Sequence, residues 1–112
     1  MLWSLFCYAE GNGFDMNKLE YFGKVIKVVT ELMDVTDQEI LGQSREFDVV
    51  DARWMVIFLM REEGYSTRQI SKLMLRPART VNHALSSFSI RSKNPFSSIG
   101  KTLAIARQQL KE

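Results

Sequence analysis

Apolar residues recur at helical spacing along most of the chain and predict a fold built from helices. From Leu19 to Met33 they return every three or four positions, which predicts an amphipathic helix of about four to five turns. A second run, residues 48–63, is apolar on almost every side, and a helix without a polar face belongs at the centre of a fold. Because Glu62, Glu63 and Gly64 end this run as they would end a helix, we expect a helix here rather than a strand.

Capping and breaking residues divide the rest of the chain into shorter helices. Residues 36–39 (Thr-Asp-Gln-Glu) and 66–69 (Ser-Thr-Arg-Gln) have the capping-box pattern, in which a hydroxyl pairs with a Glu or Gln three residues later. Pro77 is expected to open a further helix, because proline is favoured in a first turn and poor in a helix interior. The expected architecture is all-α, with about six helices in an orthogonal bundle around the central helix 48–63 and a helix-turn-helix over residues 66–90.

The length of 112 residues fits one domain. Residues 1–15 show no clean period, and we interpret them as an N-terminal tail or an arm that packs on the domain formed by residues 16–112. The longest unbroken apolar run, from Trp54 to Met60, is seven residues. Such a run is too short to cross a bilayer, so a membrane is not an expected partner.

The residue inventory argues against a metal site and against an enzyme. One cysteine (Cys7) and one histidine (His83) cannot form an internal disulfide or a zinc site between them. The sequence has no phosphate-binding GxxxxGK[ST] run, and no acid lies near His83 in sequence to orient it as a catalytic base. We expect no enzymatic activity, no cofactor and no bound metal, and the single cysteine suits the reducing cytoplasm.

The net charge of +2 hides a strong asymmetry between the two halves of the chain. Residues 1–63 hold 12 acidic and 6 basic side chains, a net charge of −6, whereas residues 64–112 hold 1 acidic and 9 basic ones, a net charge of +8. Positive charge gathered in one half indicates a surface that faces a polyanion. The alternative is that the acidic half neutralises the basic half within the folded molecule.

Residues 64–83 have the layout of a helix-turn-helix: a short capped helix, a tight turn and a second helix. In this arrangement the second helix can lie in the major groove, with its first residues at the base edges. Its expected outward positions carry hydrogen-bond donors and no acid, and they are Ala78, Arg79, Asn82, His83 and Ser86. Arginine prefers guanine and asparagine suits adenine. The alternative is a plain helical hairpin within a bundle.

Two motifs make most of the chain, from about residue 25 to residue 110, resemble the C-terminal DNA-binding domain of the bacterial replication initiator DnaA. The first motif is matched by Ser44-Arg45, Ala52-Arg53 and Leu59-Met60-Arg61-Glu62. The second, the nonapeptide Arg-Asp-His-Thr-Thr-Val-x-His-Ala, is matched in part by Arg76, Thr80, Val81, His83 and Ala84. The resemblance implies an all-α helix-turn-helix fold that binds double-stranded DNA, and it implies that Arg45 enters the minor groove.

The chain departs from that family at the residues that read bases. Pro77-Ala78-Arg79 replaces Asp-His-Thr, and Glu46-Phe47-Asp48 stands where basic residues are usual. The turn also lacks the family's Gly-Gly pair and is one residue shorter, a register that resembles the helix-turn-helix of LuxR-type and sigma-like regulators. The resemblance therefore extends to the fold and the mode of groove entry, and not to the initiator's own recognition sequence.

These observations predict sequence-specific binding of double-stranded DNA by a stand-alone regulator of transcription or replication, from a bacterium, a mobile element or a phage. The candidate DNA-binding residues are Arg45, Ser66, Thr67, Arg68, Arg76, Ala78, Arg79, Thr80, Asn82, His83, Arg91 and Lys93. The competing interpretation is a protein-interaction module that kept the fold but lost base recognition. Its partner would be a replication or transcription protein, and a second copy of the chain is a further candidate partner.

Overall fold

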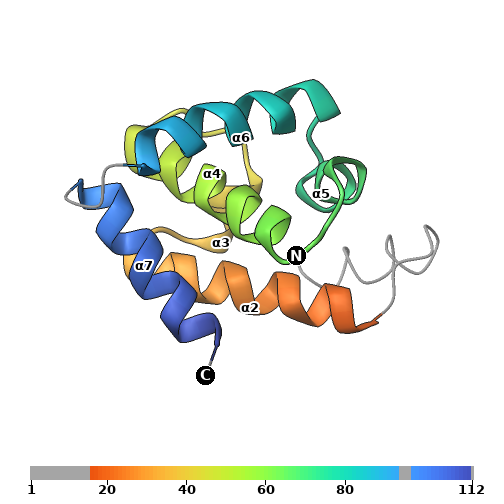
Figure 1. The fold of residues 1–112 in the computed structure, drawn as a ribbon. Helices are drawn as coiled ribbons and strands as arrows, with labels where there is room; N and C mark the ends of the chain where they lie inside the picture. The colour runs from red at the N-terminus through yellow and green to blue at the C-terminus, as the bar shows by residue number, and fades with distance from the viewer. Residues whose placement is uncertain (1–15, 94–96, 112) are drawn as a thin grey trace.

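The computed structural model describes residues 16–93 and 97–111 and places six α-helices in them (Figure 1). The helices are α2 (Met16–Met33), α3 (Asp37–Leu41), α4 (Phe47–Glu62), α5 (Thr67–Met74), α6 (Ala78–Ser92) and α7 (Ser98–Leu110). No strand occurs within these ranges, so the all-α prediction is confirmed. The interpretation of residues 1–15 as a tail or packing arm lies outside the described residues.

Helix α4 is the centre of the fold, as its pattern predicts. Figure 1 shows α2 along one side of α4 and α6 along the opposite side, and α4 packs against both. Met55 and Met60 of α4 are completely buried, and α7 closes the bundle between α2 and α6. The helix begins and ends one residue earlier than the predicted range of 48–63, because Glu46 and Glu63 are its cap residues.

Local hydrogen bonds begin the helices at the predicted places. Ser66 caps α5 through a complete capping box: its hydroxyl accepts from the Gln69 amide at 3.1 Å, and the Gln69 side chain accepts from the Ser66 amide at 3.0 Å. Thr36 and Glu39 form the same reciprocal pair at the start of α3. Two orphan amides are satisfied at each of these helix starts, which is why the pattern predicts them well.

Helices α5 and α6 are joined by a three-residue turn, Leu75–Pro77. Figure 1 shows α5 beside α6, which runs across the picture, and the two helices pack against each other. Pro77 opens α6 as predicted, but as the N-cap and not within the first turn, because its ψ of 148° is extended. Ile70 and Leu73 of α5 and Val81 of α6 are completely buried, so the unit is fixed to the rest of the bundle.

The turn between α5 and α6 contains a strained residue. Leu75 adopts the left-handed conformation, with φ 56° and ψ 44°, and its side chain is 60% exposed. This conformation is costly for a residue with a Cβ atom and free of that cost for glycine. We expect Leu75→Gly to raise the free energy of unfolding by about 1 kcal/mol, measured by urea denaturation. Leu75→Ala is the matched control, and equal stability of the glycine and alanine variants would contradict the prediction.

Candidate functional site

One face of α6 is exposed and carries no acid. The five predicted outward residues, Ala78, Arg79, Asn82, His83 and Ser86, are all exposed, so this part of the prediction is confirmed. Val81, Ala84 and Phe88 are completely buried on the opposite face. Because α6 contains no Asp or Glu anywhere along its length, nothing on the helix itself repels an anion.

The N-terminus of α6 is exposed and has no side-chain cap. Pro77, the N-cap, provides no capping side chain, and Ala78, Arg79 and Thr80 in the first turn are all exposed. The first amides of a helix have no partner within the helix and carry partial positive charge. The start of α6 therefore combines unpaired backbone donors with the Arg79 guanidinium on one surface.

The segment between α3 and α4, residues 42–46, lies beside this helix start; we call it the connector. A pocket of about 330 Å³ separates the connector from α6. Its polar lining consists of Gln43, Ser44, Arg45, Arg53, Arg76 and Thr80. Three of the predicted site residues, Arg45, Arg76 and Thr80, thus meet around one pocket although they are far apart in sequence.

Arg53, on α4, holds the connector in place by hydrogen bonds. Its side chain is only 9% exposed, and it donates to four backbone carbonyl groups. The Nε–H donates to Ile40 at 2.7 Å, Nη1 to Ser44 at 3.1 Å, and Nη2 to both Glu39 and Gly42 at 3.0 Å. Sequence reasoning treated Arg53 only as part of a family motif and missed this role. A charged residue directly followed by a long apolar run, Trp54 to Met60, is the signal that could have revealed it.

Arg76 points inward, toward the same connector. Its Nη2 donates to the Gly42 carbonyl, which also accepts from Arg53. Burial lowers the pKa of Arg76, and burial followed by the nearby charge of Arg76 lowers the pKa of Arg53. The Nε of Arg76 is buried without a hydrogen-bond partner in the described structure. The side chain of Arg76, a predicted DNA contact, therefore reaches from the turn to the connector, where its end group is engaged by the protein.

The remaining predicted site residues divide into two groups. Ser66 and Thr67 lie at the start of α5, where the Ser66 hydroxyl is engaged as the cap, and Arg68 beside them is exposed. Arg91 and Lys93 lie at the other end of α6, about 20 Å from Arg79 along the helix. The structure therefore does not bring all twelve residues into one cluster.

Ion pairs across the molecule neutralise part of the basic half. Arg91 contacts Asp51 at 2.6 Å and Arg107 contacts Glu62 at 2.5 Å, so two bases of the C-terminal half are matched by acids of the N-terminal half. By contrast, Arg45, Arg68, Arg79 and Lys93 are exposed and have no ion pair within the described ranges. The sequence-based alternative of internal neutralisation thus applies to two pairs and leaves these four cations to the solvent.

Trp54 supports the exposed face of α6 from α4. Its ring meets the His83 ring edge-on at a centroid distance of 5.8 Å, and the Arg91 guanidinium lies 5.9 Å from its ring centre. Trp54 is half-buried and packs against the core, as its position on the central helix predicts. His83 is exposed beside it and lies on the outward face of the helix, as expected.

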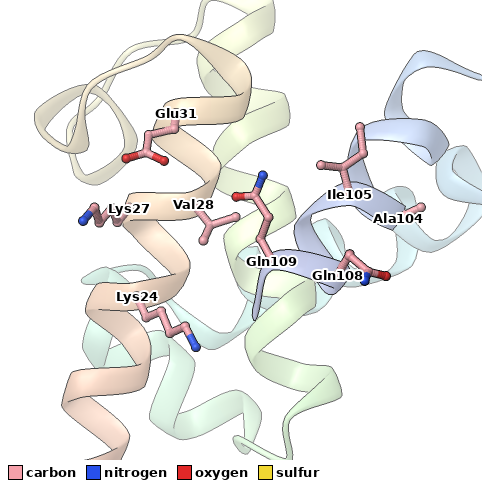
Figure 2. Close-up of a pocket in the computed structure, with 8 residues that line it drawn as sticks. All are labelled: Lys24, Lys27, Val28, Glu31, Ala104, Ile105, Gln108 and Gln109. Atoms are coloured by element: carbon pink, nitrogen blue, oxygen red, sulfur yellow. The ribbon is translucent and has the colours of Figure 1, made fainter. Parts of the chain in front are cut away.

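A second surface feature lies on the other side of the bundle, between α2 and α7. It is an open groove of about 740 Å³ (Figure 2). Figure 2 shows Val28 of α2 and Gln109 of α7 between the two helices, while Lys27 and Glu31 point away from α7. Lys24 donates to the Leu110 carbonyl at 3.1 Å, and Ile105 is 48% exposed. The groove is of mixed charge and lacks the cationic character of the α6 face.

No helix within the described ranges is both long and apolar enough to span a bilayer. In the same ranges, no three His, Cys, Asp or Glu side chains lie together as metal ligands would. A scan of protein-family models finds none that matches this chain, and a search of curated proteins finds no match.

Proposed function

We propose that this protein binds double-stranded DNA, with α6 as the helix that enters the major groove. The observation that carries the proposal is the exposed face of α6, which has no acid and an open N-terminus next to Arg45. The phosphates along a DNA groove are anions. A helix start that can bind an anion, beside arginines without ion pairs, would suit contact with them. The mode of entry would be that of the DnaA-like and LuxR-like helix-turn-helix domains that the sequence resembles.

Specific roles follow from position on this face. Arg79, in the first turn of α6, would reach the acceptor pair of guanine, and Asn82, about one turn later, would suit adenine. Arg45 on the connector would reach the flanking backbone or minor groove, and Arg68 and Lys93 would contact phosphates on either side. Such a protein would act as a regulator of transcription or replication in the cytoplasm of a bacterium.

A second candidate function is the docking of another protein in the groove between α2 and α7. The groove favours it because Ala104 and Ile105, both exposed, present apolar surface between polar side chains. In that case the chain would have kept the helix-turn-helix as a scaffold.

Fluorescence anisotropy with a mixed pool of labelled duplexes tests the first proposal. Release of counterions from about three phosphate contacts should weaken binding on the order of 40-fold between about 50 and 200 mM salt. The three contacts correspond to the exposed and unpaired Arg45, Arg68 and Lys93.

Lys27→Gln is the control, because Lys27 is exposed on α2, away from the proposed interface. It should leave both the affinity and the salt dependence nearly unchanged. Absence of duplex binding at low salt would contradict the proposal and favour protein docking.

A further inference from the structure

The pocket between the connector and α6 is cationic without a compensating acid. Three arginines line it, Arg45, Arg53 and Arg76, and no acidic residue in the described part of the chain does. Within the described residues, Arg53 and Arg76 have no carboxylate partner, and their hydrogen bonds go to backbone carbonyls. Buried or half-buried cations are normally paired with anions, so the pocket lacks a negative charge.

The arrangement disfavours the charged forms of Arg53 and Arg76. Burial lowers the pKa of each, and the charge of Arg76 lowers that of Arg53 further. The Nε of Arg76 is buried and unpaired, although buried polar groups are nearly always hydrogen-bonded. An anion next to both guanidinium groups would stabilise their charged forms and relieve their mutual repulsion.

The rim of the pocket supplies donors that an oxyanion can use. Thr80 is exposed in the first turn of α6, and Arg45 is exposed on the connector opposite it. The amides at the start of α6 have no side-chain cap, and two residues of this helix start, Pro77 and Thr80, line the pocket. The helix start is thus one part of a site that the arginines define independently.

We propose that this pocket binds one phosphate group of the DNA backbone, with Arg45 and Thr80 as its direct ligands and Arg53 and Arg76 as the fixed charges behind them. The proposal rests on the proposed DNA binding and assigns a single contact within it. A backbone phosphate fits better than a free anion, because Thr80 is adjacent to Arg79 and the pocket therefore opens at the start of the reading face. One phosphate fixed there would set the register of α6 in the groove.

The test is a scan of a selected duplex in which each backbone phosphate in turn is replaced by a neutral methylphosphonate. For the unaltered protein we expect one position at which neutralisation weakens binding by roughly tenfold or more, as for the loss of a charge-assisted hydrogen bond. In Arg45→Gln and in Thr80→Val, sensitivity at that position should fall to about twofold or less, while the other sensitive positions keep theirs.

Arg68→Gln is the matched control, because Arg68 is an exposed arginine that does not line the pocket. It should keep the sensitivity at the assigned phosphate. Both Arg45 and Thr80 are exposed, so their variants should melt at the temperature of the unaltered protein, which separates a lost contact from a damaged fold.

The possible outcomes distinguish failure of the phosphate assignment from failure of the proposed DNA binding. Duplex binding whose sensitive phosphates are the same in all three variants overturns the pocket and leaves DNA binding standing. Absence of duplex binding overturns both. Titration with inorganic phosphate distinguishes a DNA phosphate from free phosphate as the ligand, with the Ser44 and Thr80 amide signals in nuclear magnetic resonance spectra as the readout. Saturable shifts of these signals, together with a methylphosphonate scan that is the same in every variant, would assign the pocket to free phosphate and overturn the DNA contact.

Discussion

Arg53→Met is expected to lower the free energy of unfolding by about 3 kcal/mol, measured by urea denaturation. Methionine replaces most of the aliphatic volume of arginine, so the change removes hydrogen bonds more than packing. Four carbonyl groups accept from Arg53, and those of Glu39 and Ile40 belong to α3 beneath the connector. The carbonyls of Gly42 and Glu39 keep another donor each, Arg76 and the Gly42 amide, so the main loss is at Ile40 and Ser44. A buried acceptor left without a donor costs about 1–3 kcal/mol, and solvent entering the connector offsets part of the total.

Arg53→Lys and Arg68→Met make the result interpretable. Lysine keeps the charge but cannot reach four carbonyls with one ammonium group, so we expect a loss between zero and that of the methionine variant. Arg68 is an exposed arginine without an ion pair in the described ranges, and its replacement should change stability by no more than about 0.5 kcal/mol. A loss below about 1 kcal/mol in Arg53→Met would show that the connector does not depend on these hydrogen bonds.

The same substitution links stability to the proposed site. Arg53 and Arg76 both donate to Gly42, at the start of the connector, and Arg45 lies three residues later. Without Arg53 the connector loses its hydrogen bonds from this side chain to the carbonyls of Gly42 and Ser44. We therefore interpret Arg53 and Arg76 as residues that position Arg45, the arginine proposed to contact DNA.

Much of the fold could be predicted from the sequence because its signals are local. The capping boxes at Thr36 and Ser66 depend on residues three positions apart, and the structure shows both complete. The buried face of α6 follows from the spacing of Val81, Ala84 and Phe88, and the outward face follows from what remains. Even the central position of α4 follows from apolar residues that occupy almost every side of the helix.

The roles of individual arginines could not be predicted, because they depend on contacts distant in sequence. Arg76 reaches a carbonyl 34 residues away, and Arg91 pairs with an acid 40 residues away. Sequence reasoning placed both among the DNA contacts, on charge and on their place in or beside the helix-turn-helix. In the structure the end group of Arg76 is engaged by the connector, and the charge of Arg91 is partly met by Asp51.

The second large effect is expected at Arg79, the exposed arginine in the first turn of α6. A bidentate contact between arginine and a base edge discriminates by about 1–3 kcal/mol, or roughly 5- to 150-fold in affinity. Arg79→Ala should therefore reduce the preference for the best site over a scrambled one by that factor, mostly by weakening binding to the best site. Arg45→Ala should weaken binding to both duplexes alike, or relax an A·T preference at the flank, because phosphate and minor-groove contacts carry little sequence information.

The ratio of these two affinities is the measurement that tests the reading role of α6 most directly. A preferred site is first selected from random duplexes, and the affinities for that site and its scrambled version are then measured for the unaltered protein, Arg79→Ala and Arg45→Ala at one salt concentration. We expect the ratio to fall by roughly 5- to 150-fold in Arg79→Ala and to change little in Arg45→Ala. A ratio that Arg79→Ala leaves intact would contradict the proposed docking of α6 through this residue.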